Sequence, residues 1–216
     1  EWDVEGAAPE SKQGWTRYVA GVVTLLRRLG ARLTGFDLHI SSDIPIGSGL
    51  SSSAALSVGC AKALATIAGE TLTATDLIDL ARTTEREFVG VPCGILDQTA
   101  ILLCRAGHAL RIDCRSRETE QVAIPESEFA FLLINTRLPR TLAGSAYAQR
   151  LAECAEAVEY FARLRPDVRA LRDVDTMTVR RHSSQLAPVP FARALHVTTE
   201  NQRVLEFVVA LQAGEW

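Results

Sequence analysis

Residues 43–55 constrain this chain more than any other stretch, and they read Asp-Ile-Pro-Ile-Gly-Ser-Gly-Leu-Ser-Ser-Ser-Ala-Ala. Alternating apolar residues over 36–40 predict a strand before this loop, and apolar residues at helical spacing over 56–67 predict a helix after it. The first amides of a helix are unpaired, and the helix dipole is positive at that end. Because glycines also let the backbone approach a bulky anion, the pattern favours a phosphate-binding loop.

The same residues have a plainer explanation. Serine is a common N-cap residue with no functional role, so this stretch alone leaves phosphate binding and simple helix capping both open. Two familiar nucleotide loops are excluded. No Lys-Ser or Lys-Thr pair follows the last glycine, as it does in the P-loop, and the Gly-x-Gly-x-x-Gly pattern of dinucleotide-binding proteins and protein kinases is absent.

Composition excludes several classes of protein. A formal net charge of −3 over 216 residues gives no basic surface, which argues against nucleic acid as a partner. No apolar run is long enough to span a bilayer, so we expect no membrane partner. The five cysteines form no Cys-x-x-Cys pair, and the four histidines are far apart, so we predict free thiols in a reducing cytoplasm and no zinc site. The first residue is not methionine, and we expect a segment of a longer protein.

The rest of the chain mixes helix and strand patterns, which predicts an α+β fold. We expect a first lobe over 1–125 and a second lobe over 126–216, with the boundary in the short polar stretch 125–128. Residues 180–190 are predicted to form a surface loop. Helices are expected over 15–29, 77–88, 147–161 and 204–211, a half-buried strand over 110–114 and a fully buried strand over 129–134. Thr73 and Asp76 have the spacing of a capping box at the start of the second of these helices.

A second informative stretch covers residues 91–98, Val-Pro-Cys-Gly-Ile-Leu-Asp-Gln. Asp97 is its only acid, and a carboxylate among apolar residues costs free energy unless it is paired or functional. A helix-capping role is the plain alternative, because aspartate is common at helix N-termini.

Several motifs, taken together, resemble those of the family of galactokinase, homoserine kinase, mevalonate kinase and phosphomevalonate kinase, with the galactokinases as the closer group. The resemblance runs from about residue 15 to residue 211 and keeps the family order of motifs. The matching stretches are Gly47–Ala55, Cys93–Gln98, His108–Ser116, Arg140–Arg150 and Thr199–Glu206. The resemblance implies a two-lobed small-metabolite kinase fold, with an N-terminal lobe like domain 2 of ribosomal protein S5 and a ferredoxin-like C-terminal lobe, here incomplete at both ends.

The resemblance also implies ATP and Mg²⁺ as cofactors and α-D-galactose as the substrate, phosphorylated at its anomeric hydroxyl. It assigns Asp97 as the catalytic residue, Ser53 and Glu85 as Mg²⁺ ligands, and Gly94, Asp97 and Tyr147 as galactose-binding residues. The residues implied to wrap the ATP phosphates are Gly47, Ser48, Gly49, Leu50, Ser51, Ser52 and Ser53. Two alternatives stay open: Glu85 lies among charged residues that suit a solvated face, and Tyr147 heads an apolar helix face that suits a core.

Two motifs of the resembled enzymes do not occur in this chain. One is an N-terminal arginine followed by Gly-Glu-His-x-Asp-Tyr, and the other is a C-terminal glycine-rich loop. We therefore expect the isolated 216-residue segment to be inactive and the full-length protein to be a monomeric, cytoplasmic galactokinase. The alternatives are a related kinase for N-acetylgalactosamine or another small metabolite, and a non-catalytic homologue that senses galactose or ATP.

Overall fold

The computed structural model describes residues 14–125, 127–128, 130–134 and 147–215, and the chain divides into two compact units, 1–143 and 144–216. This division follows compactness, so the predicted boundary between functional lobes at residues 125 and 126 stays a prediction. Helices with a small sheet confirm the α+β class. Among the helices of the described ranges, none has the length and hydropathy that a membrane crossing requires.

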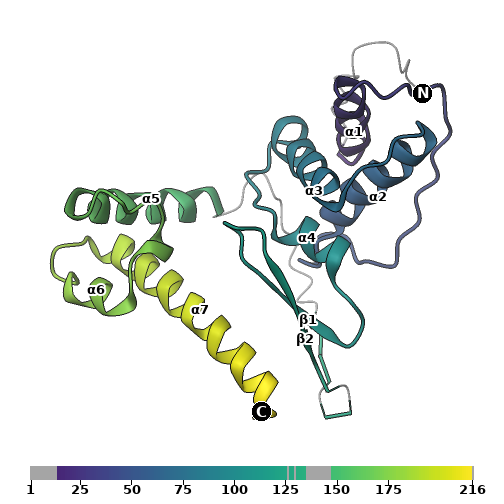
Figure 1. Cartoon of the computed structure of the whole chain (residues 1–216). Helices are drawn as coiled ribbons and strands as arrows, with labels where there is room; N and C mark the ends of the chain where they lie inside the picture. The colour runs from purple at the N-terminus through teal and green to yellow at the C-terminus, as the bar shows by residue number, and fades with distance from the viewer. Residues whose placement is uncertain (1–13, 126, 129, 135–146, 216) are drawn as a thin grey trace. The chain divides into compact units, whose positions relative to one another are not determined.

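The helices labelled α1 to α4 in Figure 1 belong to the first unit, which has one apolar core. Its elements are α1 (Thr16–Arg28), α2 (Ser52–Ile67), α3 (Ala74–Thr83), the π-helix η1 (Thr84–Val89), α4 (Leu96–Leu103), β1 (His108–Ile112) and β2 (Thr119–Ala123). Leu26 of α1 and Leu64 of α2 are almost fully buried at the centre of this core. The two strands pair antiparallel, with Leu110 opposite Gln121.

Several predicted elements of this unit are confirmed. The helix face predicted over 15–29 is α1, and the helix predicted after the Gly/Ser loop is α2. Thr73 and Asp76 form the predicted capping box: the Thr73 hydroxyl oxygen accepts from the Asp76 amide at 3.2 Å, and the Asp76 carboxylate accepts from the Thr73 amide at 2.9 Å. The helix predicted over 77–88 is α3, but it continues as a π-helix from Thr84 rather than as an α-helix.

Two predicted strands are not formed. Residues 36–40 and the described residues of 129–134 have no strand hydrogen bonds, although their apolar patterns suit strands. Phe36 and Leu38 pack against the core of the first unit, whereas Phe131 and Ile134 are 78% and 77% exposed, so the second stretch is not buried as we predicted. A strand is stable only when a neighbouring strand pairs with it, and no described segment does so here.

The second unit is helical in its described part. It contains α5 (Tyr147–Leu164), the 3₁₀ turn η3 (Leu171–Asp173), α6 (Thr176–Arg181) and α7 (Pro188–Ala213), which enclose a core that includes Phe161, Val179 and Ala194. The helix predicted over 147–161 is confirmed as α5. The loop predicted over 180–190 is wrong at both ends. Arg180 and Arg181 are the last residues of α6, and Pro188 begins α7, where a proline costs no helical hydrogen bond.

The core of the first unit can be tested on α1. Leu26→Ala removes a side chain that is 1% exposed and should lower the free energy of unfolding by roughly 2–5 kcal/mol. Leu29→Ala is the matched control, because Leu29 is 67% exposed and its loss should change the free energy by about 0.5 kcal/mol or less. Urea unfolding followed by circular dichroism measures both. Equal effects of the two substitutions would contradict the packing described for α1.

Candidate active site

The Gly/Ser loop has a left-handed backbone at several residues just before α2. Its backbone is left-handed at alternate residues, with φ of 72° at Gly47, 81° at Gly49 and 57° at Ser51. Alternation of this kind turns successive N–H groups toward one point and makes an anion-binding nest. A Cβ built on either glycine would meet no atom within 4 Å, so the space above the loop is open.

Ser51 distinguishes this loop from an ordinary helix cap. It is the N-cap residue of α2, yet its side chain makes no capping hydrogen bond, which removes the plain explanation that we left open. Its positive φ is also strained for a residue with a Cβ, and strain of this kind costs about 1–3 kcal/mol and collects at functional sites. The Ser51 side chain therefore leaves the first amides of α2 available to another hydrogen-bond acceptor, such as a bound anion.

Glu85 is buried, although the charged residues around it suggested a solvated face. It lies in the first turn of the π-helix η1 and is only 3% exposed, so the solvated-face alternative is wrong. A π-turn changes the direction of the side chains that follow it, and such turns often occur at functional sites. Here the carboxylate points into the protein, while Arg86 and Glu87 of the same turn are exposed.

The buried carboxylate has neutral partners. The Gln98 Nε2 group donates to Glu85 Oε1 at 2.8 Å, and the Ser53 hydroxyl lies within hydrogen-bonding reach. Burial is the main cause that raises the pKa of Glu85; these two hydrogen bonds lower it, and the charge of Asp97 raises it slightly. No lysine or arginine of the described ranges forms a salt bridge with Glu85.

Asp97 lies beside this buried group but faces solvent. It is the second residue of α4, whose N-cap is Ile95, so Asp97 is not the capping residue that we considered. Gln98, the next residue, is 1% exposed and contacts Glu85. Helix α4 therefore exposes the Asp97 carboxylate to solvent, while the buried side-chain amide of Gln98 bonds to Glu85.

The donor set suits Mg²⁺ bound together with phosphate groups. Mg²⁺ takes hard oxygen ligands, keeps several waters and is usually held by one or two carboxylates plus phosphate oxygens. Glu85 and Ser53 supply a carboxylate and a hydroxyl, and the buried Gln98 Oε1 atom has no hydrogen-bond partner in the structure. Within the described residues no group of three or more His, Cys, Asp and Glu side chains could hold a metal alone.

The predicted site residues divide between the two units. Ser53, Glu85 and Asp97 come together in the first unit, from α2, η1 and α4, and Gly94 is exposed three residues before Asp97. Tyr147 is the first residue of α5 in the second unit and is 47% exposed, so the core alternative for it is wrong. Its predicted contact with the substrate stays a prediction.

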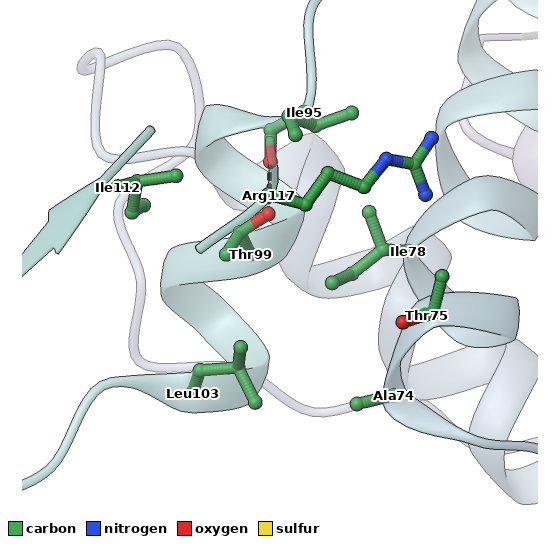
Figure 2. A pocket seen from close by; sticks show the side chains of 8 residues that line it. All are labelled: Ala74, Thr75, Ile78, Ile95, Thr99, Leu103, Ile112 and Arg117. Carbon is green, nitrogen blue, oxygen red and sulfur yellow. Dashed lines mark hydrogen bonds between the residues drawn. The ribbon is translucent and has the colours of Figure 1, made fainter. Parts of the chain in front are cut away.

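An enclosed pocket lies elsewhere in the first unit, between α3, α4 and the turn after β1 (Figure 2). Its volume is about 50 Å³, far below the roughly 300–1,000 Å³ of a small-molecule site. Arg117 covers one side and forms a paired salt bridge with Asp79, with N–O distances of 2.8 and 2.9 Å. The pocket is a small packing gap beside α4, and none of the predicted site residues lines it.

Two residues of this site had no predicted role. Gln98 stands directly after Asp97 in the motif we singled out, and its position there was the available signal. Tyr18 belongs to the apolar face of α1, yet burial and the charge of Glu85 raise the pKa of its hydroxyl, while Ser53 lowers that pKa. The helical pattern of α1 gave no reason to separate Tyr18 from the core residues around it.

Comparison with known proteins gives consistent results. Residues 17–105 match the model of the GHMP kinases N terminal domain. A galactokinase from Roseiflexus sp. (strain RS-1) is 43% identical over 205 residues, which cover 95% of this chain and 52% of the relative. A galactokinase from Haemophilus influenzae (strain PittGG) is 38% identical over 219 residues, which cover 100% of this chain and 56% of the relative.

A solved structure agrees with these relatives. The crystal structure of Lactococcus lactis galactokinase complexed with galactose has a TM-score of 0.85 to this chain at 30% identity. The match covers 99% of this chain and 55% of the other. The chain thus spans about half the length of the relatives that it matches.

The burial of Glu85 predicts an unusual effect of substitution. Glu85→Gln should raise the free energy of unfolding at pH 7 without divalent cations, because it removes a charge that burial disfavours. Since the pKa of Glu85 is raised in the folded chain, the folded state binds more protons between the folded and unfolded pKa values. The stability of the parent therefore falls as the pH rises through this range, and the gain from Gln should shrink as the pH falls to about 4.

Urea unfolding in EDTA at the two pH values measures this effect. Glu87→Gln is the matched control on the same π-helix. Its carboxylate forms an exposed pair with Arg28 at 3.3 Å, which is worth about 1 kcal/mol or less, so this substitution should bring no gain. A loss of stability in Glu85→Gln at pH 7 would show that the folded chain satisfies the carboxylate without a cation.

Proposed function

We propose that the chain, whose residues 17–105 match the GHMP kinases N terminal domain, carries the ATP-binding loop and the catalytic aspartate of a galactokinase. The reaction is transfer of the γ-phosphoryl group of ATP to the anomeric hydroxyl of α-D-galactose. One observation carries the proposal: an anion-binding nest, a buried acid and an exposed acid meet through Ser53, Glu85 and Asp97. The galactokinase relatives, at 37–43% identity, support the choice of acceptor.

The loop and Glu85 divide the binding of the nucleotide between them. The amides of residues 47–53 hold the phosphate oxygens, since the nest and the start of α2 both direct N–H groups and positive dipole toward an anion. Ser53 and Glu85 are the protein ligands of Mg²⁺. Mg²⁺ held there would supply positive charge beside the phosphate groups, and neutralising the charge of those groups is a main requirement of phosphoryl transfer.

Asp97 is the general base for the acceptor hydroxyl in this proposal. Its exposed carboxylate accepts the proton of the sugar 1-hydroxyl, typically a contribution of about 10²–10⁴-fold. The bond from the sugar oxygen to the γ-phosphorus forms, the bond from that phosphorus to the β–γ bridging oxygen breaks, and ADP leaves with the electron pair. Gly94 contacts galactose in this proposal, and the role of Tyr147 as a galactose-binding residue stays a prediction.

The cellular setting is part of the same proposal. All five cysteines are free, which suits a reducing cytoplasm, and we expect a monomer with galactose and ATP as its partners.

A substrate panel tests the proposed function. The full-length gene product is incubated with labelled ATP, Mg²⁺ and either galactose, N-acetylgalactosamine, mevalonate or homoserine. We expect galactose to be the preferred acceptor by kcat/KM. Preference for another acceptor would contradict the galactokinase assignment, and calorimetric binding of galactose and ATP without turnover would indicate a sensor instead.

Asp97→Asn tests the role of the exposed acid in the same protein. We expect kcat to fall by about 10²–10⁴-fold, because the amide cannot accept the proton, while binding of ATP with Mg²⁺ stays close to that of the parent. Asp79→Asn is the matched control, since it loses only the surface pair with Arg117. A kcat for Asp97→Asn within threefold of the parent would exclude Asp97 as the base.

A further inference from the structure

The side chain of Gln98 joins helix α4 to the π-helix η1 inside the first unit. Its Nε2 group donates to Glu85 Oε1 at 2.8 Å, and both residues are buried, although they are 13 positions apart in the chain. The same nitrogen lies 3.9 Å from Cys93 Sγ, which is a weak acceptor. An ionised carboxylate can only accept hydrogen bonds, so the nitrogen end of the amide is the end that faces Glu85.

The oxygen of this amide is less well placed than its nitrogen. Gln98 Oε1 is buried and has no hydrogen-bond partner among the described residues. An unpaired buried carbonyl group lowers stability, and an apolar side chain of similar length, such as methionine, would fill the same space without that cost. A glutamine at this position is therefore explained by what its nitrogen does for Glu85 rather than by packing.

The backbone that carries Glu85 is already held by helix α1. A Cβ built on Gly21 would lie 2.8 Å from Thr84 Cγ2 and 2.9 Å from Phe88 Cγ, both in η1, and Cβ contacts below 3.0 Å essentially do not occur. This close packing fixes the backbone around Glu85 but not the torsions of its side chain. The terminal torsion of a glutamate is broad, so a hydrogen bond to one carboxylate oxygen is what fixes the position of the other oxygen.

We propose that Gln98 is a positioning residue for Glu85, the carboxylate ligand of Mg²⁺. By holding Oε1, the amide keeps the carboxylate in the one orientation that binds the cation. Gln98 also directly follows Asp97 in α4, so the bond joins the two elements that carry the acids of the site. The inference rests on the proposed function, because Glu85 is a metal ligand only in that function.

A purely structural Gln98 would behave differently, and Gln121 of β2 provides the comparison. Gln121 Nε2 donates at 2.6 Å to the carbonyl oxygen of Leu103, the last residue of α4. Its Oε1 atom is likewise buried, with no hydrogen-bond partner in the part of the chain that the structure describes. Both glutamines thus anchor α4 through one amide, but only Gln98 bonds to a carboxylate. If anchoring is the whole role, loss of either amide leaves the metal-dependent part of nucleotide binding unchanged.

The experiment is calorimetric titration of a non-hydrolysable ATP analogue into the purified full-length protein, once with Mg²⁺ and once with EDTA. We expect Gln98→Met to reduce the Mg²⁺-dependent gain in affinity about tenfold, a usual effect of losing the hydrogen-bond partner of a metal ligand, and to leave affinity in EDTA unchanged. In a Glu85→Gln background the same substitution should cause no further loss of the gain, since the two side chains act as one unit.

Gln121→Met is the matched control, and it should keep the Mg²⁺-dependent gain of the parent. A gain in Gln98→Met equal to that of the parent would overturn the inference. An equal loss of the gain in both variants would also overturn it, because anchoring of α4 would then be the cause. If the parent itself shows no Mg²⁺-dependent gain, the proposed function fails together with the inference, so the two failures are distinguishable.

A second measurement applies if Gln98→Met does not fold. The parent protein is labelled with ¹⁵N-glutamine, and its assigned side-chain amide resonances are recorded in complex with the analogue before and after Mg²⁺ is added. The Gln98 resonance should shift on addition of Mg²⁺, because its partner carboxylate becomes a ligand of the metal, while the Gln121 resonance should not. A Gln98 resonance that does not move would overturn the inference without any variant of Gln98.

Discussion

The burial of the Glu85 carboxylate, which forms no salt bridge with a lysine or arginine of the described ranges, is the constraint on which the rest of the site depends. Removing a charge from water is costly, and the neutral hydrogen bonds from Gln98 and Ser53 offset only part of that cost, as the raised pKa of Glu85 shows. The folded chain thus keeps a group that a divalent cation would stabilise. Two other features position the Glu85 side chain. The π-helix η1 turns it toward the interior, and Gly21 lets α1 pack closely against η1.

The Gly/Ser loop supplies the second part of the proposed site, which is the group of backbone amides that binds the phosphates. Its left-handed residues, including the strained Ser51, have the alternation that is typical of an anion-binding nest at the start of α2. Helices α1, α2 and α3 share one apolar core around Leu26 and Leu64. That core holds the loop and the buried acid in one rigid unit, so the geometry at the site depends on packing some distance from it.

Much of this could be predicted from sequence where the signal is local. Helical spacing located α1 and α2, and the Thr73–Asp76 capping box located the start of α3. Non-local features could not be read in the same way. Residues 36–40 alternate like a strand, but a strand also needs a partner; Glu85 has charged neighbours in sequence, but the π-turn buries it. Tyr18 has the pattern of a core residue, and only the effects of Glu85 and Ser53 on the pKa of its hydroxyl set it apart.

The central claim is that one nucleotide–metal complex occupies the space between the loop and the two acids. A crystal structure of the full-length protein with Mg²⁺, a non-hydrolysable ATP analogue and galactose tests it most directly. The account predicts a metal about 2.0–2.1 Å from Ser53 Oγ and a Glu85 oxygen, with phosphates on the amides of residues 47–53 and Asp97 hydrogen-bonded to the sugar 1-hydroxyl. A triphosphate bound away from this loop, or a metal that Glu85 does not contact, would contradict it.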